Sequence, residues 1–198
     1  MRKNCVLATL GNDPHAQGLY KASRIAQRAG IAVQLVPPGT PVREIMERIQ
    51  RDDPGYVGLS YRLSPSVGLQ EFTRFLKRLD ETGLLRTANG EVRKLAFAGL
   101  PETMRAIEGS GRSLPCEVTT MRQDDDLLDR AARVLVFFDV SDARSRTILQ
   151  DLRSELFPPT IAELDQLASA VTADDSYLTE PPLPIPSPAA MQFLRRRV

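Results

Sequence analysis

The one histidine of the chain, His15, lies in a polar loop between an apolar run and a segment with a helical pattern. Asp13 stands two residues before it and Gly18 three residues after it. A neutral imidazole binds a transition metal through one ring nitrogen, and a carboxylate on the other nitrogen fixes the tautomer and raises the basicity of the ligand. Glycine leaves room for a bulky flat ligand beside the backbone. The loop therefore indicates either a metal-ligating histidine oriented by Asp13, or a plain strand-to-helix turn with one surface histidine.

The segments that must position this loop alternate between strand-like and helix-like patterns up to about residue 138. The predicted strands cover residues 5–10, 31–36, 56–60, 94–98 and 114–118, and the predicted helices cover 17–29, 42–51, 67–82, 101–108 and a segment from 124. Residues 134–138 either end the last helix or form an extra strand. The alternation predicts an α/β fold with a doubly wound, mostly parallel five-stranded sheet of the Rossmann or flavodoxin-like type.

Three loops follow predicted strands at their carboxyl ends. The loop of Asp13 and His15 follows the first strand, residues 60–66 follow the third, and the turn at Gly99 follows the fourth. In sheets of this kind, ligands bind outside the carboxyl ends of the strands, where the chain reverses its order of travel. We therefore expect the three loops to face one rim and to form the ligand site there.

The pattern Asp-x-His-x-x-Gly at the end of a first strand, here Asp13, His15 and Gly18, resembles the fingerprint of the cobalamin-binding domain shared by B12-dependent mutases and methionine synthases. The likeness extends over roughly residues 3 to 138. It implies that His15 leaves its loop to ligate cobalt from below and replaces the cofactor's own dimethylbenzimidazole base. Asp13 would then be the carboxylate that orients the ring.

A second sign of that family is Ser-x-Leu at the end of the third strand, where the serine bonds the displaced base. Ser60 fits this position, while Leu63 comes one residue later than usual. Ser66, in the same loop, would extend the hydrogen-bond relay of the first motif, as a second serine does in methionine synthases. Both serines are also what a strand-to-helix loop uses for capping. Tyr61 and Arg62 either decorate an exposed loop or reach the upper corrin face or a partner.

The third sign is Gly-Gly after the fourth strand, where the nucleotide tail of the cofactor lies against the backbone. This chain has Ala98 and Gly99 there, so one glycine is kept. A turn glycine without a ligand is the alternative interpretation of Gly99. The connection before this strand, over residues 84–92, is also longer than is usual in the family.

The resemblance implies a protein that holds cobalamin and has no catalytic residue of its own. We expect a cofactor-binding subunit or domain that works with a catalytic barrel, on another chain or in a further portion, where the small-molecule substrate is held. Methyl carriers usually have a helical cap domain before the motif, which here begins at residue 13. This favours adenosylcobalamin and a radical mutase over methylcobalamin and a methyltransferase. A non-catalytic cobalamin carrier or sensor, and a flavodoxin-like domain with no corrin, are further alternatives.

The composition excludes several other classes of partner. The chain has 198 residues and a net charge of +1, which selects neither nucleic acid nor an acidic membrane. Aromatic residues make up 6% and tryptophan is absent, which argues against a surface that stacks single-stranded nucleic acid. No apolar stretch reaches membrane-spanning length and no secretory signal is apparent, so we expect a cytoplasmic protein. Cys5 and Cys116 are predicted to be buried free thiols in strands.

Residues 139–198 differ in character from residues 1–138, which we predict to be the cobalamin-binding domain. The later part is expected to be a helical extension, with helices over 141–156 and 160–171. Residues 177–188 contain five prolines and are predicted to form an extended arm. A docking or linker role is the function we expect for this extension.

Overall fold

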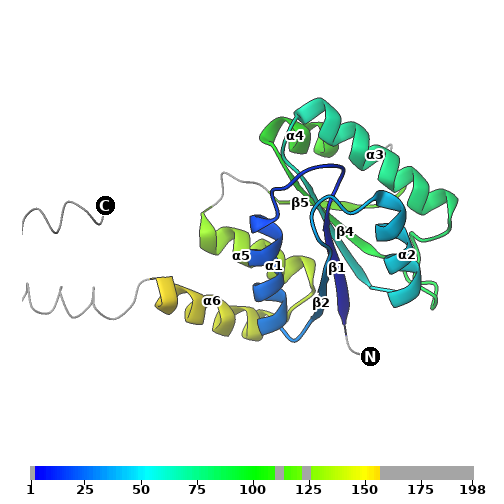
Figure 1. The fold of residues 1–198 in the computed structure, drawn as a ribbon. Helices are drawn as coiled ribbons and strands as arrows, with labels where there is room; N and C mark the ends of the chain where they lie inside the picture. The colour runs from blue at the N-terminus through cyan, green and yellow to red at the C-terminus, as the bar shows by residue number, and fades with distance from the viewer. Residues whose placement is uncertain (1–2, 110–113, 122–125, 157–198) are drawn as a thin grey trace, which may run out of the picture. The chain divides into compact units, whose positions relative to one another are not determined.

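The computed structural model describes residues 3–109, 114–121 and 126–156. Its centre is a sheet of five parallel strands in the order β2-β1-β3-β4-β5 (Figure 1). The strands are β1 (Asn4–Thr9), β2 (Ala32–Leu35), β3 (Tyr56–Tyr61), β4 (Lys94–Gly99) and β5 (Val118–Met121). The chain moves from β1 outward to β2 and then returns past β1 to β3. This reversal creates a switch point between β1 and β3, and the flavodoxin-like α/β fold predicted from the sequence is confirmed.

Helices cover both faces of the sheet. They are α1 (Gln17–Arg28), α2 (Val42–Asp52), α3 (Pro65–Glu81), α4 (Pro101–Gly109), α5 (Leu127–Phe137) and α6 (Asp142–Leu156). The alternation of side chains along each strand divides the core into two clusters. Val6, Val57 and Phe97 pack with α2, α3 and α4, while Cys5, Leu7 and Ala96 pack with α1, α5 and α6. Figure 1 shows the same division, with α1, α5 and α6 together on one side.

Spacing in the sequence explains how each helix turns one face to the sheet. In α3, Phe72, Phe75, Leu76 and Leu79 recur at helical spacing, and all are nearly or fully buried. Gly58 of β3 lies opposite Leu7 of β1, and a Cβ atom at Gly58 would stand 2.5 Å from Leu7 Cδ2. A side chain at this position would therefore force Leu7 to shift.

The fifth strand was predicted wrongly. The apolar residues 114–118 predicted it, but the strand is Val118–Met121, which pairs with β4 from Leu95↔Val118 onward. Thr119 and Thr120 made this strand hard to recognise in the sequence. Their polar side chains are typical of loops, although their β-branched shape suits a strand. Cys116 consequently lies in a bend and is half-buried rather than in a strand, while Cys5 is buried in β1 as expected; both are free thiols.

The last predicted helix of the domain is longer than the sequence indicated. Residues 134–137, left open between helix and strand, belong to α5, and Phe138 ends it. Asp126 begins this helix, because its side chain accepts a hydrogen bond from the backbone N–H of Asp129 at 2.8 Å. Val134 and Leu135 are buried against α1 and the sheet, so the apolar run serves as the inner face of a helix.

The charged helix expected over 141–156 is present as α6, and its Ile148 is buried in the same cluster as Ile25 of α1. A compact unit of the chain ends at Arg153. The assignment of residues 139–198 to a separate docking extension stays a prediction, and the helix over 160–171 and the proline-rich arm lie outside the described residues. Among the described residues, no helix is long and apolar enough to cross a membrane.

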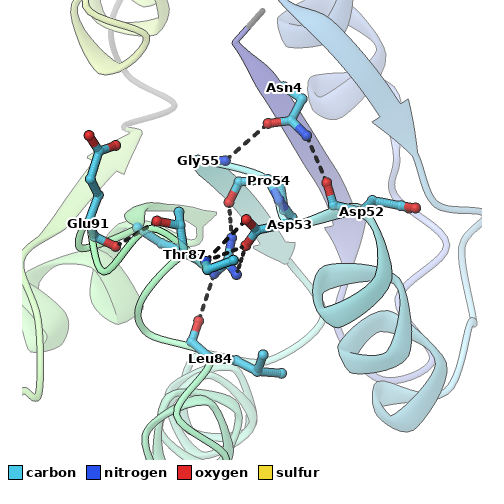
Figure 2. Close-up of polar contacts among 10 residues, drawn as sticks. Asn4, Asp52, Asp53, Pro54, Gly55, Leu84, Thr87 and Glu91 are labelled. Carbon is cyan, nitrogen blue, oxygen red and sulfur yellow. Dashed lines mark hydrogen bonds and ion pairs between the residues drawn. The ribbon is translucent and has the colours of Figure 1, made fainter. Parts of the chain in front are cut away.

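A buried arginine, Arg93, fastens the long connection before β4 to the turn that precedes β3. Its side chain is 2% exposed, and Nη2 lies 2.5 Å from Oδ1 of Asp53. Nε donates to the backbone carbonyl of Leu84 at 2.8 Å, and Nη1 donates to that of Pro54. Figure 2 shows Asp53, Pro54 and Leu84 turned toward this one point.

Asp53, the acidic partner of Arg93, ends α2 in a left-handed conformation, with φ 44°. Its carboxylate also accepts hydrogen bonds from the backbone N–H of Ala88 at 3.2 and 3.1 Å. Burial acts to raise the pKa of Asp53, but the hydrogen bonds from Arg93 and Ala88 and the charge of Arg93 outweigh it and lower the pKa. The amino-terminal edge of the sheet is therefore held by a charged, hydrogen-bonded anchor.

Candidate ligand-binding site

The loop after β1 is built around the carboxylate of Asp13, which is fully buried. Oδ2 accepts the backbone N–H of Arg62 at 2.5 Å, from the loop after β3. Oδ1 accepts the backbone N–H of His15 at 2.9 Å and lies 2.6 Å from His15 Nδ1. Backbone amides only donate, so Asp13 acts as an acceptor that joins the loops on either side of the switch point.

These contacts fix the tautomer of His15. Because the Asp13 oxygen accepts, Nδ1 of the neutral ring carries the proton and Nε2 keeps its lone pair. Nε2 has no hydrogen-bond partner within the described residues, and the side chain is 53% exposed. The imidazole is thus held from behind and offers one free donor atom, which is the arrangement predicted from the spacing of Asp13 and His15.

A cavity of about 140 Å³ lies next to this loop, between the sheet and helices α1 and α5. Its floor is made of residues from the strands, mainly small ones, and its roof of apolar residues from the two helices. The floor consists of Leu7, Gly58, Leu59, Ser60, Ala96, Ala98 and Gly99, and the roof includes Gly18, Leu19, Ala22, Ile25, Leu127, Ala131, Val134 and Phe137. His15 stands at the mouth, so the predicted rim and a real cavity coincide.

The hydroxyl of Ser60 is a buried polar group that the protein leaves unpaired. Ser60 is 3% exposed, lines the cavity, and its Oγ has no hydrogen-bond partner within the described residues. Thr9, its neighbour in register on β1, also has an unpaired buried hydroxyl. A buried hydroxyl without a partner costs about 1 to 3 kcal/mol, so the cavity is suited to a ligand with a polar atom at this depth.

The glycines and the alanine predicted for the site have different roles in the structure. A Cβ atom added to Gly18 would meet nothing within 4 Å, so the fold does not require a glycine there. At Gly99 a Cβ atom would stand 2.7 Å from Phe97 Cε1 and 3.1 Å from the carbonyl oxygen of Tyr61, so packing alone explains that glycine. Ala98 places its methyl group on the cavity floor.

Two predicted site residues lie away from the cavity. Leu63 is 50% exposed and does not line it. Ser66 is exposed, and its hydroxyl lies 3.4 Å from that of Ser64. The second oxygen of Asp13 is bonded instead by the backbone of Arg62. The roles of Leu63 and Ser66 in cofactor binding stay predictions.

Sequence reasoning missed part of the site. The sequence leaves Arg62 open between exposed decoration and a contact with the corrin or a partner, and the structure places Arg62 in the lining of the cavity together with Lys21 and Arg130. Lys21 follows Gly18 by three residues, a spacing that puts both on one helical face and was a usable signal. Tyr61 is 6% exposed, because its ring packs in the core against Gly11 and Gly68, and burial raises its pKa.

The donor set that a metal would meet here is a single imidazole nitrogen. The described residues contain no group of three or more His, Cys, Asp and Glu side chains that could hold a metal ion. Cys5 is not a further ligand, because burial raises the pKa of its thiol strongly and keeps it protonated.

Comparison with known proteins gives a fold but no family. No protein-family model matches the sequence, and no curated protein matches it. Among solved structures, a novel cobalamin-binding protein from Desulfitobacterium hafniense DCB-2 aligns at 22% identity and a TM-score of 0.54, covering 71% of this chain and 60% of that one. The methanol:cobalamin methyltransferase complex MtaBC from Methanosarcina barkeri aligns at 14% identity and a TM-score of 0.49, covering 72% and 50%.

Drosophila melanogaster DJ-1beta aligns at 12% identity and a TM-score of 0.38, covering 79% of this chain and 98% of that one. The first alignment is the one of these three with a TM-score above 0.5, and it spans three fifths of that protein's length. Together with the strand order, it establishes that this chain has the flavodoxin-like α/β fold.

Proposed function

We propose that this chain is a cobalamin-binding module that holds the cofactor with its own base displaced and with His15 Nε2 as the lower cobalt ligand. The observation that carries the proposal is the state of His15: Nδ1 is bound to buried Asp13 at 2.6 Å while Nε2 stays free and exposed. A metal held by one protein nitrogen takes its other ligands from elsewhere, as it does when a macrocycle carries it. A solved protein of the same fold is described as cobalamin-binding.

The cavity suits one ring of the displaced base. An apolar cavity of roughly 150 Å³ holds one benzene-sized ring, and this one is about 140 Å³. The base has two fused rings, so its second ring would lie toward the opening at the rim. The unpaired hydroxyl of Ser60 would bond a ring nitrogen of the base. Open space at Gly18 would let the corrin edge approach the start of α1. The residues present therefore suit both ends of a cobalamin, the metal and the nucleotide tail.

The residues of the chain have binding and orienting roles in this proposal. Asp13 holds the proton at His15 Nδ1, keeps the ring directed outward and raises the basicity of Nε2. When bound, the cofactor would supply cobalt–carbon bond chemistry. The substrate would be held by a catalytic barrel on another chain or domain, because no residue of this cavity is proposed to act on a substrate.

For the reaction, we propose an adenosylcobalamin-dependent radical mutase. A methylcobalamin-carrying module of a methyltransferase is the alternative from the same family resemblance, and a non-catalytic carrier or sensor is the alternative from a different class. The upper axial group separates the first two. A mutase module should bind adenosylcobalamin at least as tightly as methylcobalamin, whereas a methyl carrier should prefer the smaller methyl form.

The test is titration of the apo chain with both cobalamins, followed by visible spectroscopy and affinity measurement. We expect the wild-type chain to give the spectrum of base-displaced, histidine-ligated cobalamin. His15→Ala should remove that spectrum and weaken binding at least about tenfold. Asn12→Ala, an exposed change in the same loop, is the matched control and should change neither. A wild-type chain that leaves the spectrum unchanged would refute the proposal and favour a flavodoxin-like domain without a corrin.

A further inference from the structure

We propose that Lys21, Arg62 and Arg130 form a cationic collar at the cavity mouth that binds the phosphodiester of the cofactor's nucleotide tail. This inference rests on the proposed function and names a subsite within it. Its consequence is selectivity: the module should discriminate complete cobalamin from cobinamide, the same corrin without the phosphate, ribose and base.

The first observation is the charge of the lining. Three separate elements contribute cations to one small cavity: α1 gives Lys21, the loop after β3 gives Arg62, and α5 gives Arg130. The described residues that line the cavity include no Asp or Glu. Almost every other lining side chain is apolar, so an uncharged ring alone would not account for the three positive groups.

The second observation is that two of these cations have no side-chain partner. Within the described residues, Lys21 and Arg62 make no side-chain hydrogen bond or ion pair. Arg130 has only its Nε engaged, with the carbonyl oxygen of Asp126 at 3.3 Å. Some cations elsewhere in the chain are paired, as Arg43 is with Glu47 at 2.8 Å. The collar therefore has donors available for an anion.

The third observation is the start of α1. This helix has no side-chain cap and no acidic residue in its first turn, whereas α5 is capped by Asp126 and has Asp129 in its first turn. The free N–H groups and the positive end of the helix dipole at Gln17 and Gly18 favour an anion at the same mouth. Ser60 supplies an independent sign of a ligand, because its unpaired, buried hydroxyl lies inside the same cavity.

These features indicate which part of the ligand would lie where along the cavity. An aromatic base fits the apolar depth beside Ser60, and a phosphate joined to that base through a sugar would emerge at the mouth among Lys21, Arg62 and Arg130. A phosphodiester keeps its negative charge throughout the neutral range and accepts several hydrogen bonds, which suits lysine and arginine donors. The collar thus recognises the chemistry next to the base rather than the corrin.

The test compares cobalamin and cobinamide on the wild-type chain and on Lys21→Met, Arg62→Met, Arg130→Met and the triple variant. Methionine keeps an unbranched stem and removes the charge. We expect each change to weaken cobalamin binding about three- to tenfold and to leave cobinamide binding unchanged. Raising the salt concentration should reduce the wild-type preference for cobalamin, because the Debye length falls from about 10 Å at 0.1 M to about 3 Å at 1 M.

Arg24→Met is the matched control, since Arg24 is exposed on the same helix and does not line the cavity. It should alter neither affinity. If the triple variant loses cobalamin and cobinamide affinity equally, or loses neither, the collar is refuted while the histidine-ligated spectrum still supports the proposed function. If inorganic phosphate binds the collar as tightly with cobalamin present as without it, the anion site is separate from the tail and the inference also fails. A wild-type chain that binds neither corrinoid overturns both proposals.

Discussion

Replacement of Asp13 by Asn tests the logic of the site because the two side chains have the same shape. The carboxylate of Asp13 accepts three hydrogen bonds: from His15 N, from His15 Nδ1 and from Arg62 N. Asparagine has one acceptor oxygen and one donor NH₂ group. In either orientation, the NH₂ group would face a backbone N–H that also donates. At least one buried hydrogen bond is therefore lost.

The expected loss of stability is about 1 to 3 kcal/mol, the usual cost of leaving a buried donor unpaired. We would measure it by urea unfolding of the apo chain at pH 7. The orientation of the amide also decides the tautomer of His15. If NH₂ faces the ring, Nδ1 must accept, and the proton moves to Nε2, where it blocks metal binding. Nitrogen NMR reads this directly, because the chain has one histidine and gives one imidazole signal set.

Asp80→Asn is the matched control, since Asp80 is exposed on α3. It should change stability by less than about 0.5 kcal/mol. An Asp13→Asn chain as stable as this control would show that the three contacts do not hold the loop. A wild-type His15 with its proton at Nε2 would refute the assigned role of Asp13 even if stability falls as expected.

Three further predictions address the cavity and the anchor. Ser60→Ala should leave the apo chain as stable or up to about 1 kcal/mol more stable, because it removes an unpaired hydroxyl, and should weaken cobalamin binding; lower stability in urea unfolding would contradict this. Gly18→Val should leave the apo fold intact, since a side chain there meets open space, but should block the corrin, so retained affinity in a cobalamin titration would contradict the proposed approach. Asp53→Asn should destabilise the chain at neutral pH, with a difference from wild type that vanishes in acid.

The sign of the Asp53 effect follows from its pKa, which folding lowers. The stabilisation that this carboxylate provides is present above the pKa of the unfolded chain, near 4, and is lost as the pH falls through the lower pKa of the folded chain. Asparagine tolerates the left-handed backbone at this position, so the substitution removes the charge without straining the backbone. Unfolding curves of both proteins from pH 7 down to pH 2 check this, and a difference that persists unchanged at pH 2 would contradict it.

The sequence was sufficient for most of the fold because the strands and helices bury regular faces. The run from Tyr56 to Ser60 was nearly continuous in apolar residues, which only a central parallel strand requires, and β3 lies there with every residue buried. β5 was misplaced for the opposite reason. It lies at the edge of the sheet and is only half-buried, so its Thr119 and Thr120 need not be apolar.

The part of the candidate site formed by residues close in sequence was predictable. The part formed by residues far apart in sequence was not. Asp13 and His15 are two residues apart, so their contact follows from one turn of loop. Lys21, Arg62 and Arg130 line one cavity only because α1, the loop after β3 and α5 meet there in the tertiary fold. The residues next to each of these cations in the sequence do not indicate that the three line the same cavity.

Arg93, at the other edge of the sheet, is a second residue whose role depends on contacts between distant parts of the sequence. A lone arginine next to a strand resembles a solvated residue, yet it is almost completely buried because it bonds carbonyl groups of two turns far apart in the sequence. Its burial depends on the tertiary fold, and the sequence pattern of residues 84–92 indicated only an unusually long connection.

The position of that anchor separates substitutions that lower stability from substitutions that impair ligand binding. The Arg93–Asp53 pair grips the ends where β3 and β4 begin, and Asp13 and His15 lie where β1 ends. Six residues of β3, fully extended, put about 20 Å between these places. In a genetic screen, substitutions of Arg93 or Asp53 should therefore appear among poorly expressed clones, while a screen for loss of red, cobalt-loaded protein among well-expressed clones should collect its hits around the strand ends, at His15 first.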